Sequence, residues 1–213
     1  MSGPVVLVDY GVGNLLSVVA AFEHCGTKLE MTADPKRISR AERIVLPGVG
    51  AFGDCMHEIR RRHLEAPILE FARSGRPFLG ICVGMQVMME IGEEFGTHDG
   101  LGLIPGRVRE IERTTADGRM HKLPHVGWNR LRPANGGTWA GTILADTGVG
   151  ESVYFVHSFT ADPADPHHRL ADADYNGRSI CAAIQVGSAF GTQFHPERSG
   201  EAGLNIIRRF LSL

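Results

Sequence analysis

The first 81 residues of the chain alternate between short apolar runs and stretches in which apolar residues recur every three or four positions. The short runs predict strands that are buried on both faces, as in a parallel sheet. The alternation predicts an α/β fold, a mostly parallel twisted sheet with helices on both faces. The predicted strands are residues 5–8, 28–31, 43–46 and 77–81, and the predicted helices begin near Leu15, Phe52 and Pro67.

After Cys82 the pattern first predicts a helix and then a different kind of sheet. Apolar residues keep helical spacing from Val83 to Phe95, so we expect a helix over this range. Beyond it, short strand patterns and hairpin-type turn pairs predict antiparallel strands. The strands are expected at 107–112, 152–159, 179–185 and 189–194, the turns at Asp117-Gly118 and Asn176-Gly177, a surface loop at 161–168 and an amphipathic helix at 204–211.

The composition is that of an ordinary soluble globular protein. With 213 residues the chain is long enough for a large core, and we expect residues 1–213 to form one domain. A formal net charge of -2 argues against a nucleic-acid or anionic-membrane surface. The 4 cysteines include no C-x-x-C pair, so we expect no structural zinc site and no secreted disulfide framework. No cofactor is expected either. The run at 5–8 is too short for a signal peptide or membrane span, and a cytoplasmic protein is expected.

Cys82 lies at the junction between the predicted strand 77–81 and the helix after it. Gly80 and Gly84 flank it two residues away on either side, the G-x-C-x-G pattern of a nucleophile elbow with sulfur in place of oxygen. The start of a helix favours a thiolate, and its free N–H groups favour a developing oxyanion. Free cysteines are also often buried as small apolar residues. The motif alone leaves both interpretations open.

Two glycine-rich turns follow predicted strands earlier in the chain. Gly11-x-Gly13 resembles the start of a dinucleotide-binding loop, but Leu16 occupies the third glycine position. A tight loop that touches a partner or simply turns is therefore favoured. Pro47-Gly48-Val49-Gly50 places several backbone N–H groups near a neighbouring strand end. On its own this segment favours a plain strand-to-helix turn.

A second stretch with chemical content is Gln193-Phe194-His195-Pro196-Glu197. Residues two apart in an extended segment face the same side, and Pro196 favours an extended backbone, so His195 and Glu197 are expected to point together. A carboxylate on one ring nitrogen fixes the tautomer of a histidine base. The short string alone is more often a surface turn. A cysteine elbow and a His-x-Glu pair in one α/β chain, however, predict a Cys82–His195–Glu197 triad.

Residues 80–86 (GICVGMQ) and 191–197 (GTQFHPE) together resemble the triad-type, or class I, glutamine amidotransferases, which have a flavodoxin-like α/β fold. Within that family, residues 47–53, 122–129 and 154–159 resemble the glutaminase subunit of imidazole glycerol phosphate synthase, from histidine biosynthesis. The similarity covers essentially the whole chain. Its most specific piece is the Pro-His-x-Gly-Trp-Asn string.

The resemblance implies glutamine hydrolysis, in which Cys82 attacks the side-chain amide, His195 moves the proton and Glu197 holds the imidazole. Val83 stands where leucine is usual, but that position acts through its backbone N–H. The implied oxyanion donors are Val49, Gly50 and Val83, and the implied glutamine-binding residues are Gln86, His157, Ser158 and Phe159.

The resemblance also implies a partner, because ammonia released into water is mostly protonated and lost as a nucleophile. In the family a separate (β/α)₈ cyclase subunit receives the ammonia and makes imidazole glycerol phosphate and an aminoimidazole carboxamide ribotide. We therefore expect a heterodimer. Trp128 is equally compatible with a core position, and Arg198 stands where lysine is usual. The residues expected near the interface are Val12, Asn14, Pro124, Trp128 and Arg198.

Three alternative functions stay open from the sequence. One is a glutaminase of another pathway, such as pyridoxal phosphate or p-aminobenzoate synthesis, which the string at 124–129 disfavours. Another is a γ-glutamyl hydrolase or cysteine peptidase that uses the same triad. The third is a non-catalytic regulatory module on this fold.

Overall fold

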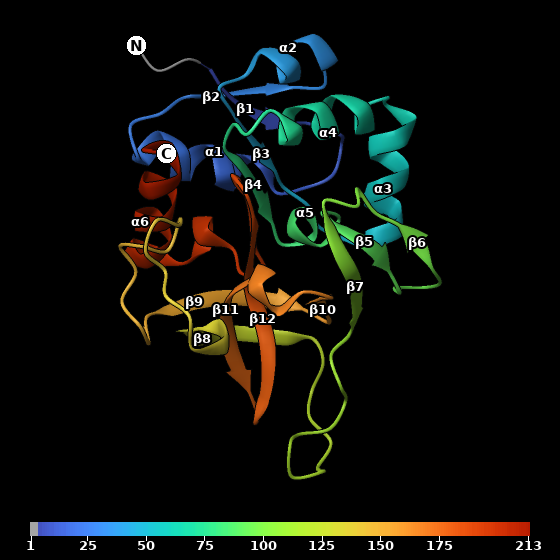
Figure 1. The fold of residues 1–213 in the computed structure, drawn as a ribbon, viewed down its shortest axis with the longest axis vertical. Helices are drawn as coiled ribbons and strands as arrows, with labels where there is room; N and C mark the ends of the chain where they lie inside the picture. The colour runs from blue at the N-terminus through green and yellow to red at the C-terminus, as the bar shows by residue number, and fades with distance from the viewer. Residues whose placement is uncertain (1–3) are drawn as a thin grey trace.

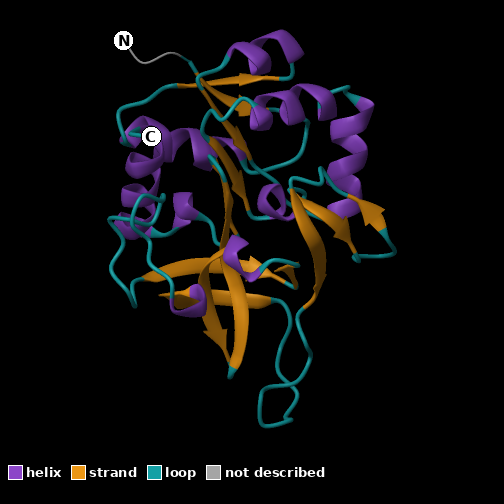
Figure 2. Cartoon of the chain, viewed as in Figure 1, coloured by secondary structure: helices purple, strands orange, loops and turns teal. Residues whose placement is uncertain are grey.

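The computed structural model describes residues 4–213, and a mixed sheet runs through its middle (Figures 1 and 2). Within that range the sheet has nine strands in the order β2-β1-β3-β4-β13-β12-β11-β8-β9. The first five run parallel, and from β12 onward each strand pairs antiparallel with its neighbour. The strands are β1 (Val5–Val8), β2 (Leu29–Thr32), β3 (Arg43–Leu46), β4 (Phe78–Ile81), β8 (His125–Pro133), β9 (Ser152–His157), β11 (Arg169–Tyr175), β12 (Arg178–Val186) and β13 (Ala189–Thr192).

Helices cover both faces of the parallel half of this sheet. On one face α1 and α6 meet through Phe22 and Phe210, whose ring centroids are 6.3 Å apart, and α2, α3 and α4 lie on the other (Figure 1). Between these layers β1 and β4 are buried along their whole length, as their continuous apolar runs require. The helices are α1 (Leu15–His24), α2 (Pro35–Arg40), α3 (Phe52–Arg61), α4 (Glu65–Arg73), α5 (Val83–Gln86) and α6 (Gly200–Leu211). The predicted α/β architecture is confirmed.

A smaller sheet lies beside the first. In the described part of the chain it has four strands in the order β10-β7-β5-β6. Its strands are β5 (Met89–Gly92), β6 (His98–Asp99), β7 (Ile104–Glu110) and β10 (Phe159–Pro163). Ser158 alone separates β9 from β10, so the chain passes from one sheet to the other at that residue. The Asn176-Gly177 turn joins β11 to β12 with positive φ at both residues (54° and 81°), as predicted for a two-residue hairpin.

Two local predictions are wrong, and one strand was missed. The helix expected over 83–95 stops at Gln86, because the chain from Met89 pairs with β7 as strand β5, and Phe95 takes a φ of 56°. The loop expected at 161–168 starts as part of β10, with Ala161 paired to Val108. Strand β8 carried no clear pattern of its own.

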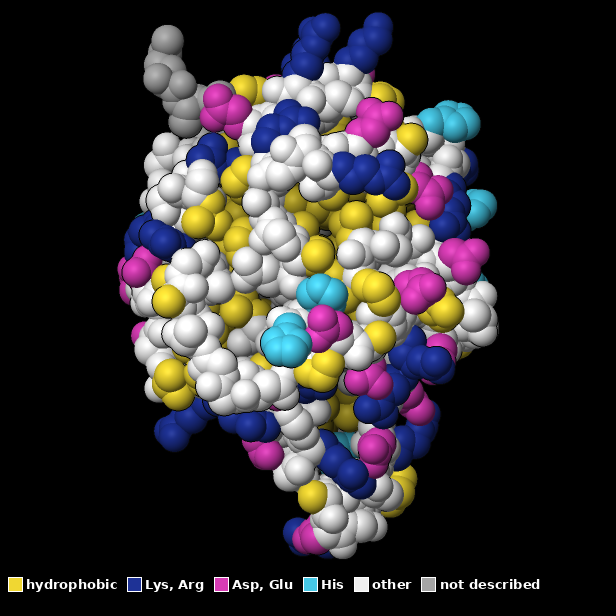
Figure 3. Space-filling view, viewed as in Figure 1, with side chains coloured by type: hydrophobic (Ala, Val, Ile, Leu, Met, Phe, Trp, Pro, Cys, Tyr) yellow, Lys and Arg dark blue, Asp and Glu magenta, His cyan; other side chains and the backbone are white. Residues whose placement is uncertain are grey.

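The surface agrees with the modest net charge. On the face that Figure 3 shows, basic and acidic side chains are interspersed, with no broad area of one sign. None of the helices in residues 4–213 is both long and apolar enough to cross a membrane. In the same range no group of three or more His, Cys, Asp or Glu side chains is arranged to hold a metal ion.

Candidate active site

Cys82 forms the sharp turn between β4 and α5. Its φ and ψ are 55° and -112°, a region that a residue with a Cβ rarely occupies. A methyl group at Gly84 would lie 1.9 Å from the Leu46 carbonyl oxygen, and one at Gly80 would lie 2.7 Å from the Gly84 oxygen. Both glycines are therefore required by close backbone packing, which explains the spacing of the elbow motif.

His195 and Glu197 form a buried pair in which Nδ1 lies 2.8 Å from Oε1. The expectation that they point together is correct, but its reason is not, because Pro196–Arg198 forms a turn of 3₁₀ helix (η3) and not an extended segment. Ser199 fixes this turn, since its Oγ donates to the His195 carbonyl (2.6 Å) and accepts the Tyr154 N–H (3.0 Å). The turn is thereby tied to β9.

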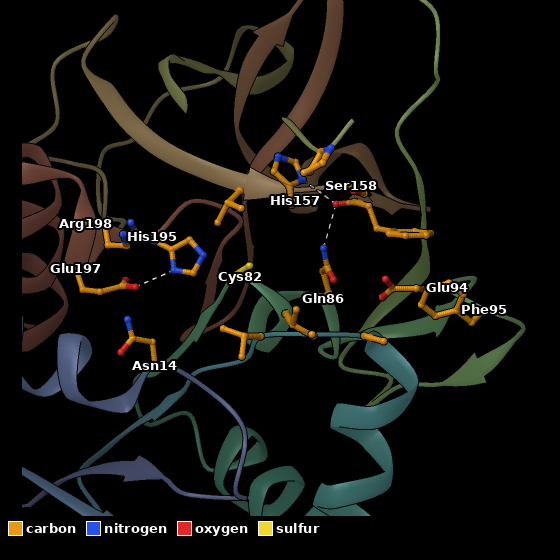
Figure 4. Close-up of a pocket in the computed structure, with 17 residues that line it drawn as sticks. Asn14, Cys82, Gln86, Glu94, Phe95, His157, Ser158, His195, Glu197 and Arg198 are labelled. Carbon is orange, nitrogen blue, oxygen red and sulfur yellow. Dashed lines mark hydrogen bonds and ion pairs between the residues drawn. The ribbon is translucent and has the colours of Figure 1, made fainter. Parts of the chain in front are cut away.

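The second ring nitrogen of His195 faces Cys82 (Figure 4). This Nε2 is buried and has no hydrogen-bond partner within the described residues. Burial lowers the pKa of His195, but the proximity of Cys82 and Glu197 outweighs it and raises that pKa to about 10. A histidine that keeps its proton at neutral pH beside a cysteine favours the thiolate electrostatically.

Cys82 and His195 open into a cavity of about 570 Å³. The residues predicted from the sequence that line it are Cys82, His195, Glu197, Val49, Gly50, Val83, Gln86, His157, Ser158, Phe159, Asn14, Pro124 and Arg198. The remaining two predicted residues do not line the cavity. Val12 packs partly buried against the core, and Trp128 is 58% exposed, so the core alternative for Trp128 is wrong.

Two side chains fix the loop between β3 and α3 by hydrogen bonds to its backbone carbonyls. The Tyr10 hydroxyl donates to the Pro47 carbonyl (2.6 Å), and the Cys55 thiol donates to the Val49 carbonyl (3.4 Å). Because a trans peptide places N–H and C=O on opposite sides, the N–H of Gly50 points away from Cys55. Val83 is the first residue of α5, so its N–H has no partner inside the helix.

Sequence reasoning assigned no site role to three residues at this site. Glu94 and Phe95 line the cavity from the segment that was predicted to be helical, and Glu94 also accepts the Phe52 N–H (2.8 Å). Gln193 is buried and donates from Nε2 to the Cys82 sulfur (3.8 Å). Only Gln193 carried a signal in the sequence, since it lies inside the GTQFHPE string.

Comparisons with known proteins agree on one family. The model for "Glutamine amidotransferase class-I" matches residues 6–212. "Imidazole glycerol phosphate synthase subunit HisH 1" of Legionella pneumophila (strain Lens) is 50% identical over 210 residues, 98% of this chain and 99% of the relative. The HisH subunit of Rhodopirellula baltica is 47% identical over 208 residues, 97% and 96% of the two chains.

Among solved structures, PurLQS from Thermotoga maritima is 22% identical and aligns with a TM-score of 0.72 over 100% of this chain and 99% of that one. At this identity the structural match supports the fold alone. The sequence matches cover nearly the whole chain at about half identity. The chain therefore belongs to the class-I glutamine amidotransferase family and, within it, groups with the HisH subunits of imidazole glycerol phosphate synthase.

Proposed function

We propose that this protein hydrolyses L-glutamine to glutamate and ammonia, and passes the ammonia to a cyclase subunit in histidine biosynthesis. One observation carries the proposal. Cys82, at the start of α5, and the hydrogen-bonded His195–Glu197 pair lie beside each other in the wall of a cavity of about 570 Å³. A nucleophile, a proton carrier and an orienting carboxylate in that order are what amide hydrolysis through a thioester needs.

The chemistry follows from the charge states. The Cys82 sulfur attacks the side-chain amide carbon of glutamine, and its electron pair forms the C–S bond while the carbonyl becomes an oxyanion. The raised pKa of His195 provides a proton on Nε2, which passes to the leaving nitrogen so that ammonia departs. His195, now neutral, removes a proton from water as the water attacks the thioester. Glutamate leaves, and the pair regains its starting charges.

Backbone and side-chain groups divide the remaining tasks. The N–H groups of Val83 and of the Val49-Gly50 turn are assigned to the oxyanion, where one donor contributes on the order of 10²–10³ in rate. Gln86, His157, Ser158 and Phe159 line the other end of the cavity and are assigned to glutamine. Glu94 joins them, because its carboxylate at the cavity wall complements the ammonium group of an amino acid.

The partner assignment rests on residues that line the cavity and on the relatives, whose name describes a subunit of a synthase. Asn14, Pro124 and Arg198 line the cavity, and Trp128 is exposed on the neighbouring strand β8. We assign these residues, with Val12, to the contact with the (β/α)₈ cyclase subunit and place the heterodimer in the cytoplasm. Direct transfer across this contact keeps ammonia unprotonated.

The test is glutamate release from glutamine by the purified protein, alone and with the cyclase subunit and its ribotide ligand. Cys82→Ala is expected to lower the rate by at least about 10³-fold. Cys25→Ala, at a partly exposed cysteine bonded to the Leu204 carbonyl, is the matched control and should keep the rate. Full activity in Cys82→Ala would refute the mechanism. Turnover of γ-glutamyl peptides without turnover of glutamine would favour the hydrolase alternative.

A further inference from the structure

Gln193 connects the nucleophile to a buried network of polar side chains. The residue follows β13 directly and is 0% exposed, and its Nε2 lies 3.8 Å from the Cys82 sulfur. A buried amide without partners costs free energy, so both ends of this side chain must be used. Its Oε1 accepts from Gln86 Nε2 at 3.0 Å, which leaves the NH₂ end for the sulfur.

The direction of these bonds follows from a group that can act only as an acceptor. The Phe159 carbonyl lies 3.0 Å from the amide of Gln86, and a carbonyl has no proton to give, so the Gln86 NH₂ must face it. The same NH₂ then faces Gln193, whose oxygen must be turned toward it. The N–H groups of Gln193 are consequently directed at Cys82.

Two neutral histidines hold the Phe159 carbonyl in place. His157 Nδ1 donates to this carbonyl (2.8 Å), and His157 Nε2 accepts from His125 Nδ1 (3.0 Å). Burial lowers the pKa of His157 to about 3 and that of His125 to about 4, so both rings are neutral at physiological pH. The Asn129 amide lies 3.5 Å from the free nitrogen of His125, which needs a donor there. The bonds from Asn129 to His125, from His125 to His157 and from His157 to the Phe159 carbonyl therefore all run in one direction, toward that carbonyl.

We propose that Gln193 is a further catalytic residue, whose N–H donates to the Cys82 sulfur and stabilises its thiolate, and that Gln86 and the His157–His125 pair are positioning residues that aim it. The bond has its greatest strength when the sulfur is charged, as it is when the thioester breaks. No proton moves along it, because the proton transfers of the reaction are carried out by His195. The proposal rests on the proposed function in one respect only, namely that the Cys82 thiolate attacks glutamine.

The test uses alkylation by iodoacetamide, which reports the thiolate and needs no glutamine site. The rate is followed on the Cys82 peptide by mass spectrometry from pH 4 to pH 9. Gln193→Glu keeps the shape and the acceptor for Gln86 but loses the donor when ionised, and Gln193→Met loses both without adding charge. Gln185→Met, on strand β12, is the control, because the Gln185 Nε2 donates to the nearby Gly187 carbonyl and, within residues 4–213, the side chain makes no other hydrogen bond.

Both Gln193 variants are expected to move the acid limb of the profile up by about one pH unit, so that on that limb they alkylate about tenfold more slowly than the wild type. Gln185→Met should keep the wild-type profile. A purely structural role for Gln193 would lower thermal stability and leave the acid limb unmoved. A wild-type profile in either Gln193 variant overturns the proposal. Absence of glutamine turnover in the wild type would count against the proposed function. The alkylation rates would still test the role of Gln193, because alkylation does not depend on glutamine.

Discussion

Gly203 lies outside the cavity, yet its replacement by alanine is expected to impair the active site. The residue is buried in α6, where this helix packs against η3. A Cβ at Gly203 would lie 1.9 Å from the Pro196 carbonyl oxygen and 2.8 Å from the carbonyl carbon. Both obstacles are backbone atoms of the turn that carries Glu197, so neither can rotate away.

Two effects of opposite sign determine the outcome. Alanine in place of glycine inside a helix gains about 1 kcal/mol from conformational propensity. Ordinary contact begins near 3.4 Å, so helix and turn must separate by about 1.5 Å. Overpacking of this kind costs roughly 1–3 kcal/mol in flexible cores, and a rigid backbone obstacle lies at the upper end. We expect a net loss of about 1–2 kcal/mol, which for a chain of this size lowers Tm by about 2–8 °C.

The separation of α6 from the η3 turn is also expected to lower the rate of catalysis. Moving Pro196 moves Glu197, whose Oε1 lies 2.8 Å from His195 Nδ1. A misplacement of about 1 Å in a catalytic group costs on the order of 10² in rate. We expect kcat for glutamine to fall by about that factor while KM changes little, because Gln86 and His157 lie on other elements.

The measurement is thermal unfolding together with steady-state glutamate release. Gly148→Ala is the control, since its Cβ would meet only the end of the Glu151 side chain, which can turn away. That variant should keep both Tm and kcat. A Gly203→Ala protein with a raised Tm and an unchanged kcat would show that helix propensity outweighs the contact, and the reasoning would fail.

Two further predictions concern buried charge. Burial lowers the pKa of His157 to about 3, so below about pH 6.5 the unfolded chain binds a proton at this residue that the folded protein does not bind, and between pH 6.5 and 5 the free energy of unfolding falls by about 2 kcal/mol. His157→Gln should flatten the pH dependence of urea unfolding by that amount. An unchanged slope would contradict a neutral buried ring. Asp172 is 5% exposed and accepts hydrogen bonds from Arg169 (2.6 Å) and Ser179 (2.9 Å). Asp172→Ala should therefore lower the free energy of unfolding by about 3 kcal/mol without changing kcat. Asp117→Ala, at an exposed ion pair with Arg119, should change the free energy of unfolding little.

The features that the sequence predicted correctly are local ones. The buried runs of β1 and β4, the elbow around Cys82 and the two-residue hairpin each depend on a few adjacent side chains and their backbone preferences. The short spacing of His195 and Glu197 brought them together even though the turn between them is helical. The expected helix over 83–95 failed for the opposite reason, because pairing of β5 with β7 decides that conformation.

The network around Gln193 shows the same limit at longer range. Its bonds join Gln86 to Phe159, Gln86 to Gln193 and Gln193 to Cys82, across separations of 73, 107 and 111 residues. Hydrophobic periodicity predicts nothing over such separations in sequence. The identity of Gln193 inside a recognised motif therefore does not predict which side chains it bonds to. Only the fold specifies which of its two amide ends faces the sulfur.

Sheet order explains how residues so far apart meet. Strands β3, β4 and β13 are parallel neighbours, and the loop at 47–51, the Cys82 elbow and the His195 turn each follow the carboxyl end of one of them. In an open parallel sheet these ends share one edge, which is where ligand sites form. Along the chain, β13 follows the antiparallel strands β8, β9, β11 and β12 and returns to pair with β4. The second half of the chain therefore supplies His195, Glu197 and Gln193 to the edge of the sheet at which the first half places Cys82.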